Sequence, residues 1–153
     1  YSNTKIIPLK DLKSKDLYYL NMAIQVAEES RFESSHRVGA CLVDGKIAYT
    51  GENQHREHAG KCHHNSLHAE IHAILRCLRI RYKTTNLRSK YDLSGTTIYV
   101  ARLPTGNARN YFGNSKPCSN CQIYLSKFGI RKVKYTDVID NIPVLCELRL
   151  NKN

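Results

Sequence analysis

Potential metal ligands at the starts of two predicted helices constrain the fold of this chain most. Cys118 and Cys121 begin a segment with helical periodicity over residues 118–128. Their three-residue spacing places both sulfurs on one helix face, where they can hold one ion. His68 begins a second such segment, over residues 68–81. If His68 shares that ion, the fold must bring the two helix starts together.

The remaining periodic segments predict one more helix and five strands. The helix covers residues 14–31, and the strands cover residues 38–43, 47–50, 97–101, 133–136 and 144–148. Asp44-Gly45 is a hairpin signal between the first two strands. The order α-β-β-α-β-α-β-β predicts an α/β fold, a three-layer sandwich with one mixed five-stranded sheet and helices on its faces. Because 153 residues is the size of one ordinary domain, we expect a single domain over residues 1–153.

One histidine and two cysteines would leave tetrahedral zinc with an open fourth position, which is typical of a catalytic site and holds water. We therefore expect His68, Cys118 and Cys121 to bind zinc (Zn2+), which would lower the pKa of that water. Glu70 lies two residues beyond His68 and could take a proton from the water and pass it on. Each of the two motifs, Cys-x-x-Cys and His-x-Glu, also has a simpler interpretation. C-x-x-C occurs in redox pairs and by chance, and H-x-E occurs at exposed helix starts.

An excess of positive charge indicates which partners are favoured. The 24 Lys and Arg residues against 13 Asp and Glu give a formal net charge of +11. That charge favours nucleotides, nucleic acid or anionic surfaces, although a basic protein without such a partner has the same composition. The chain has no run of about 18 apolar residues and no basic-then-apolar leader, so we expect neither a membrane span nor export. We expect reduced thiols and an intracellular location, cytoplasmic or nuclear.

The two metal motifs together are more specific than either alone. H-x-E followed by P-C-x-x-C is the signature of zinc nucleobase deaminases. Both halves are complete here, in Leu67-His68-Ala69-Glu70-Ile71 and in Ser115-Lys116-Pro117-Cys118 through Cys121. On these motifs the chain resembles the cytidine deaminase-like superfamily, especially its CMP/dCMP-type branch. The resemblance covers most of the chain: residues 36–43 are similar to the family's first strand, and Gly51-Glu52-Asn53 is similar to its G-x-N element.

The resemblance implies zinc-dependent hydrolytic deamination of a nucleobase, most commonly cytosine to uracil in a nucleotide. Water activated at the zinc would attack C4 of cytosine, and Glu70 would protonate the ring nitrogen and then the leaving ammonia. Asn53 is implied to hydrogen-bond the substrate, and the backbone N–H of Ala69 is implied to anchor the base carbonyl. Because relatives often assemble into dimers or larger oligomers, the resemblance also suggests a homo-oligomer.

Three features depart from the family's pattern. A loop over residues 103–116 lengthens the interval between the metal motifs, and its Arg109, Tyr111 and Phe112 could stack on a base, hold a phosphate or be exposed decoration. Residues 136–143 are too few for a helix, so we expect the last two strands to form a hairpin, as in the nucleoside-deaminase branch. Five potential ligands precede the first motif, and we expect exposed side chains there rather than a second zinc site. They are His55, His58, Cys62, His63 and His64.

Two other functions stay open at this point. A polynucleotide deaminase acting on DNA or RNA is favoured by the charge and by two basic clusters, although solvated charged faces have the same composition. Such an enzyme needs an unpaired base and a groove for the strand. A zinc-stabilised binding module without catalysis is disfavoured by the three-ligand count and by Glu70, since structural zinc sites fill all four positions. The basic clusters are Arg76, Arg79, Arg81, Lys83, Arg88 and Lys90, and Lys127, Arg131, Lys132 and Lys134.

Overall fold

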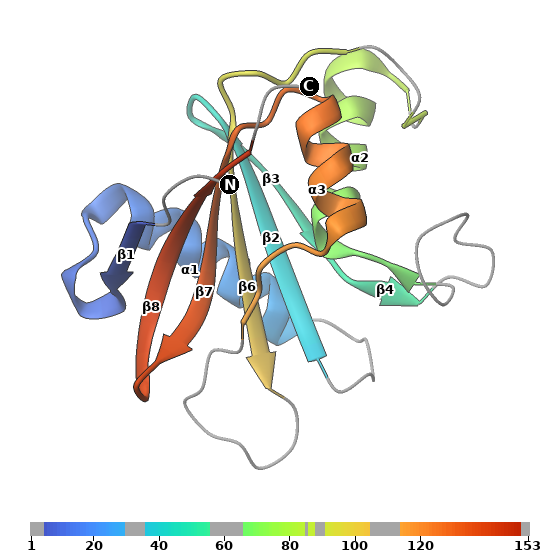
Figure 1. The fold of residues 1–153 in the computed structure, drawn as a ribbon. Coiled ribbons are helices and arrows are strands. Elements are labelled where there is room, and N and C mark those ends of the chain that lie inside the picture. The colour runs from blue at the N-terminus through green and yellow to red at the C-terminus, as the bar shows by residue number, and fades with distance from the viewer. Residues whose placement is uncertain are drawn as a thin grey trace.

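The computed structural model describes residues 5–29, 36–55, 66–84, 86–87, 91–104 and 114–150. Within them, three α-helices pack against the two faces of a twisted sheet (Figure 1). The helices are α1 (Ser14–Glu29), α2 (Ala69–Tyr82) and α3 (Ser119–Lys127), and a short 3-10 helix covers Leu9–Asp11. The strands are β1 (Lys5–Pro8), β2 (His36–Asp44), β3 (Ile47–Glu52), β4 (Gln54–His55), β5 (Ser66–Leu67), β6 (Thr97–Pro104), β7 (Lys132–Ile139) and β8 (Ile142–Arg149).

The main sheet is mixed and has six strands, in the order β1-β8-β7-β6-β2-β3. Among these described strands, β6 and β7 pair in parallel and all other neighbours pair antiparallel. The mixed sheet is confirmed, with six strands rather than the five expected. The additional strand is β1, which pairs with β8 at the edge of the sheet. An edge position suits β1 because Pro8 lacks the N–H that a central ladder requires. β4 and β5 form a separate two-stranded sheet.

Tight turns set the register of both hairpins. The turn between β2 and β3 consists of Gly45 and Lys46, one residue later than the Asp44-Gly45 signal predicts. Gly45 has a φ of 62°, the positive value that the first position of a primed turn requires. β7 and β8 form the hairpin expected at the end of the chain. Its two turn residues, Asp140 and Asn141, have φ values of 51° and 63°, as a type I′ turn requires at both central positions.

Two apolar clusters, one on each face of the sheet, form the core. On one face, Leu20 and Ala23 of α1 pack against buried residues of the sheet such as Tyr99. On the other face, α2 and α3 contribute Ile74 and Leu125 to a larger cluster. Helices on both sides of one sheet confirm the predicted three-layer α/β sandwich. Each predicted helix ends within two residues of its observed end, and Gly129 follows α3 with the left-handed φ (84°) typical of a helix C-terminus.

Two neighbouring glycines let a helix of each outer layer approach the sheet backbone. A Cβ atom at Gly39 in β2 would collide with the carbonyl oxygen of Ala23 in α1. A Cβ atom at Gly51 in β3 would collide with the carbonyl oxygen of Ala69 in α2. Gly51 pairs with Ala40, the residue after Gly39, so the two close approaches lie on opposite faces of the same point of the hairpin. The second approach sets the end of β3 against the N-terminus of α2.

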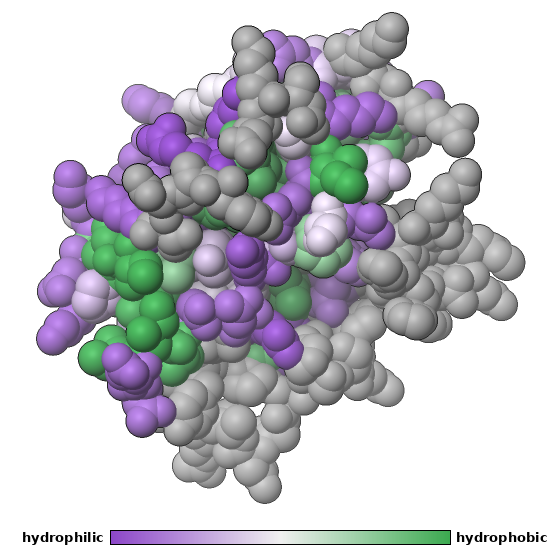
Figure 2. All heavy atoms as spheres, viewed as in Figure 1, coloured by the Kyte–Doolittle hydropathy of each residue, from purple (hydrophilic) through white to green (hydrophobic). Residues whose placement is uncertain are grey.

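Hydrophilic side chains cover most of the described surface in the view of Figure 2. Apolar surface gathers at the edge where β1 and the β7–β8 hairpin lie (Figure 2), and the large apolar residues exposed on these strands are Ile6, Ile139 and Ile142. No helix in the described parts of the chain is both long enough and apolar enough to cross a membrane.

A largely buried ion pair joins α1 to the sheet. The Asp16 carboxylate near the start of α1 lies 2.7 Å from Lys134 Nζ. The Tyr99 hydroxyl donates a hydrogen bond of 2.6 Å to the same carboxylate. Burial raises the pKa of Asp16, but the hydrogen bonds from Lys134 and Tyr99 and the charge of Lys134 outweigh burial and hold the pKa below its ordinary value of 3.8. The charged form of Asp16 therefore stabilises the folded state.

Asp16→Asn is expected to destabilise the protein in a pH-dependent way. Because the folded-state pKa lies below the unfolded-state value, the stabilisation by Asp16 is present above the ordinary value of 3.8 and is lost as the pH falls through the folded-state value. At neutral pH we expect the free energy of unfolding to fall by about 1.5–3 kcal/mol, the range for losing a hydrogen bond to a charged group. Urea unfolding at neutral pH and at about pH 2 measures the difference, which should shrink in acid. Asp11→Asn, at an exposed carboxylate, is the control; a loss of stability that is equal in the control or constant with pH would contradict this role.

Candidate metal centre

The candidate ligands lie at the N-termini of two helices. His68 is the residue before the first turn of α2, and Cys118 holds the same position before α3. Both helices pack on the same face of the sheet, where Ala69 and Cys121 belong to one apolar cluster. The expectation that the two helix starts come together is therefore confirmed.

Three potential ligand atoms meet between these helix starts. His68 Nδ1 lies 3.1 Å from Cys121 Sγ and 3.6 Å from Cys118 Sγ, and all three atoms lie within 4.8 Å of one another. A tetrahedral zinc ion with usual bond lengths separates a nitrogen ligand from a sulfur ligand by about 3.6 Å. The spacing therefore fits one zinc ion, to which the imidazole would offer Nδ1. Within the described residues, no second cluster of three or more His, Cys, Asp or Glu side chains has this geometry.

The electrostatics of the centre favour the metal-binding form of one ligand, Cys118, and the protonated form of another, His68, which would have to lose its proton to bind zinc. Hydrogen bonds with Cys121 and His68 lower the pKa of the Cys118 thiol to about 3, and the thiolate is the form that binds zinc. The N-terminus of α3 adds positive potential at this sulfur. The hydrogen bond with Cys118 raises the pKa of His68, although burial opposes it. Zinc bound by these side chains would lower the pKa of a water molecule and so supply hydroxide near neutral pH.

Glu70 lies in the first turn of α2 and is only 5% exposed. It is the one carboxylate among the buried side chains of the described residues. Burial raises the pKa of Glu70 to about 7, against the lowering effects of a hydrogen bond from its own backbone, the charge of His68 and a hydrogen bond with Cys121. A carboxyl group with such a pKa can both accept and donate a proton near neutral pH, as a general acid/base requires.

The two residues implied to contact the substrate lie at the N-terminus of α2 and just after β3, the strand whose end packs against that N-terminus. The side-chain oxygen of Asn53 accepts a hydrogen bond of 2.9 Å from the Val38 N–H, and the Asn53 N–H donates one of 3.2 Å to the Val38 carbonyl. These bonds hold Asn53 against β2, just after the end of β3 that packs on α2. Ala69 is the first residue of α2, so its N–H has no acceptor within the helix and is available to anchor a carbonyl oxygen.

A family model for the cytidine and deoxycytidylate deaminase zinc-binding region matches residues 13–137. This span includes all the residues of the candidate centre. The chain belongs to this family. It is therefore a zinc-dependent deaminase, and the resemblance seen in its two metal motifs is confirmed.

Two solved structures share the fold of the deaminase. The apo form of dCMP deaminase from the cyanophage S-TIM5 is 20% identical, with a TM-score of 0.54 over 85% of this chain and 89% of that chain. Cytidine deaminase from Burkholderia pseudomallei is 17% identical, with a TM-score of 0.56 over 87% of this chain and 91% of that chain. No curated protein sequence matches the deaminase. Identities this low support the α/β architecture and leave the substrate to be argued from the site.

His72 of α2 is a further residue of the deaminase for which the sequence predicted no role, and it contacts the strand that lies against the start of this helix. Its Nδ1 accepts a hydrogen bond of 3.0 Å from the Glu52 N–H. This bond ties α2 to the end of β3, next to Asn53. The signal that points to His72 is its four-residue spacing from His68, which places both imidazoles on one face of the helix.

Ser115 positions the second metal motif of the deaminase. It is 6% exposed, and its hydroxyl lies 2.8 Å from the Val100 carbonyl oxygen of β6. The Thr136 N–H of β7 donates a hydrogen bond of 2.7 Å to the same hydroxyl. Ser115 therefore anchors the segment that leads to Cys118 between the two parallel strands. The sequence marked Ser115 only as part of the motif.

Several expected features of the deaminase lie outside the described residues. The side chain of His55 in β4 is among them, so the expectation of exposed histidines rather than a second zinc site stays a prediction. The role of the loop before the second motif stays a prediction for the same reason. The other residues concerned are His58, Cys62, His63, His64, Arg109, Tyr111 and Phe112.

Proposed function

We propose that this deaminase converts cytosine to uracil in a nucleotide, with His68, Cys118 and Cys121 as the zinc ligands and Glu70 as the proton carrier. One observation carries the proposal. The three ligand atoms lie within 4.8 Å of one another, and Glu70, which is 5% exposed, shares a hydrogen bond with Cys121. A buried carboxyl group beside an open three-ligand zinc site is the arrangement that hydrolytic deamination needs.

In this proposal Glu70 carries out the proton transfers, and Ala69 and Asn53 bind the base. Glu70 takes a proton from the attacking water and gives it to the ring nitrogen, and then carries a second proton to the amine, which leaves as ammonia. The N–H of Ala69 and the side chain of Asn53 hold the base, so that the carbon bearing the amine would lie toward the side chains that would hold the zinc. One water is added and one ammonia leaves, and the carbon gains a carbonyl oxygen. We also propose that residues 1–153 form one domain, because both core clusters are built on a single sheet.

A panel of cytosine compounds tests this function. We expect zinc-loaded protein to release ammonia from CMP or dCMP faster than from cytidine or deoxycytidine, because the net charge of +11 favours a phosphorylated substrate. A nucleoside is the second candidate, favoured by the antiparallel β7–β8 hairpin, which resembles the nucleoside-deaminase branch. Faster release from the nucleosides would overturn the nucleotide assignment, and release from none of these compounds would overturn the choice of cytosine.

A polynucleotide substrate is less well supported by the positions of the basic clusters. Lys132 and Lys134 pair with Glu147 and Asp16, and Arg81 pairs with Asp44, which reduces the charge they offer to a strand. Single-stranded DNA and RNA therefore belong in the same panel. Salt-sensitive binding together with cytosine-to-uracil changes on sequencing would replace the nucleotide proposal with this alternative.

A further inference from the structure

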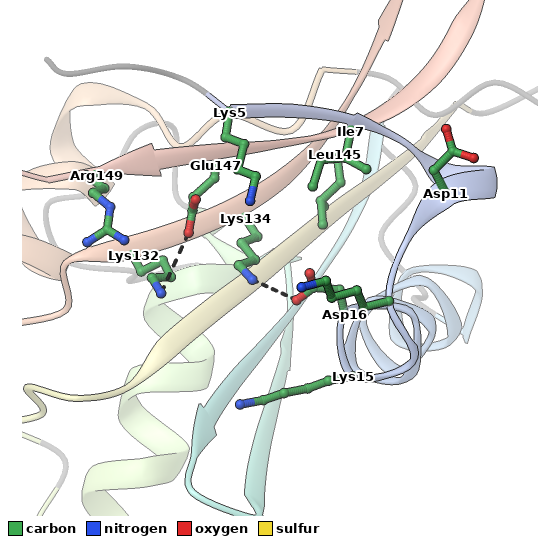
Figure 3. A pocket seen from close by; sticks show the side chains of 11 residues that line it. Lys5, Ile7, Asp11, Lys15, Asp16, Lys132, Lys134, Leu145, Glu147 and Arg149 are labelled. Carbon is green, nitrogen blue, oxygen red and sulfur yellow. Dashed lines mark hydrogen bonds and ion pairs between the residues drawn. The ribbon is translucent and has the colours of Figure 1, made fainter.

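A cavity of about 370 Å³ lies between β1, β7 and β8 and the start of α1, away from the metal centre. Figure 3 shows Lys5, Lys132 and Lys134 extending from the strands into the space that faces α1. The volume lies in the range of about 300–1,000 Å³ that is typical of small-molecule sites. Ile7 and Leu145 supply apolar surface in the lining. Nothing in the deamination proposal uses this cavity.

The sheet separates the cavity from the metal centre. Successive residues of a strand point to opposite faces. In β7, Val133 and Tyr135 pack in the cluster beneath α2 and α3, whereas Lys132 and Lys134 line the cavity. Leu145 of the lining likewise belongs to the cluster under α1. A molecule in the cavity is therefore not the one being deaminated.

The lining of the cavity is strongly positive. It contains six cationic and three acidic side chains, an excess of three positive charges. Two of the acidic groups are already neutralised, because Asp16 pairs with Lys134 at 2.7 Å and Glu147 pairs with Lys132 at 3.7 Å. The other cations have no ion-pair partner among the described residues, and Asp11 is the one acidic group left to them. These cations are Lys5, Lys13, Lys15 and Arg149.

We propose that this cavity binds a small ligand with a chain of two or more phosphate groups, such as a nucleoside triphosphate or inorganic triphosphate. The excess of three positive charges exceeds what one phosphate monoester, of charge about −1.5 to −2 at neutral pH, can neutralise. The cations come from four segments that surround the space, so a short chain of phosphates reaches more of them than a single group does. The partly exposed side chain of Ile7 can pack against a nucleoside.

Titration calorimetry with inorganic triphosphate, at low salt and on the zinc-loaded protein, tests the proposal. We expect one binding event per chain. Arg149→Glu and Lys13→Glu, both at exposed lining residues, should raise the Kd by about tenfold or more, the effect of losing one hydrogen bond to a charged group. Arg79→Glu and Lys46→Glu make the same charge changes at exposed residues outside the cavity, and should change the Kd by less than about twofold.

Further arms of the experiment separate the possible ligands. ATP binding tighter than inorganic triphosphate, with the same dependence on Arg149, would identify a nucleotide; equal binding would identify the phosphate chain alone. Both results support the site. No binding, or an equal loss in cavity and control variants of unchanged unfolding temperature, would overturn it. The proposal would also be overturned, in favour of nucleic acid, if binding of a single-stranded oligonucleotide depended on Arg149 and binding of triphosphate did not. None of these outcomes depends on which base is deaminated.

Discussion

Glu70→Gln should retain zinc and lower kcat for deamination by about 10²–10⁴-fold, the contribution typical of a general acid/base. The amide has nearly the same shape as the carboxyl group, so the buried position in α2 stays filled. It cannot accept a proton from water or return one to the base. The zinc ligands His68, Cys118 and Cys121 are unchanged, so the metal should remain at one ion per chain. Ammonia release and zinc content, measured on the same preparation, check both halves of the prediction.

Glu28→Gln is the matched control for this experiment. Glu28 is an exposed residue of α1 on the other side of the sheet, so the same chemical change should leave kcat unaltered there. A Glu70→Gln enzyme with the wild-type rate would remove Glu70 from the mechanism. A variant that loses zinc as well as activity would instead assign Glu70 a structural role at the metal.

His68→Ala should lose both the metal and the activity. The substitution removes one of three ligands, and the two remaining sulfurs then have no imidazole at 3.1 and 3.6 Å to complete the set. Loss of a partner that only orients a ligand lowers metal affinity by about 10–100-fold, so we expect loss of a ligand to exceed that. Zinc content after dialysis against a weak chelator measures the effect, and ammonia release should fall to background. The unfolding temperature should fall too, since zinc bound to the native state stabilises it.

His72→Ala serves as the control for the loss of an imidazole from the same helix face. The His72 ring contacts the backbone of Glu52 rather than the sulfurs, so this variant should keep its zinc. Retention of zinc at the wild-type level by His68→Ala would show that His68 is not a ligand and would refute the proposed metal centre.

Periodicity and spacing predicted much of this molecule because its local signals agree with its fold. α1 and α2 show helical periodicity, and Pro117 and Gly129 mark the start and the end of α3. The three candidate ligands could be chosen because His-x-Glu and Pro-Cys-x-x-Cys occur together in this chain, a combination that is more specific than either motif alone. The three ligand atoms lie within 4.8 Å of one another, which is a tertiary contact. The combined metal motif predicts this contact, whereas helix periodicity alone does not.

The features that were not predicted are those that depend on contacts between distant segments. β1 is four residues long and has no alternating pattern, and it becomes a strand only by pairing with β8. The hydrogen bonds of Ser115 to β6 and β7 and of His72 to Glu52 join segments 15 to 21 residues apart, and no local pattern encodes them. Polar residues in a motif or on a helix face have many such partners available, so their roles require the structure.

The paired approaches at Gly39 and Gly51 have a consequence for how the sequence of this enzyme can vary. Elsewhere in the core, replacing one apolar side chain by another changes the volume between layers and lets a helix shift. At this crossing, peptide groups of α1, the hairpin and α2 touch directly, and peptide groups have the same dimensions in every protein. The distance from the sheet to the start of the metal-binding helix is therefore set without side chains. Substitutions can therefore accumulate in the core while the distance between the sheet and the helix that begins beside His68 stays the same.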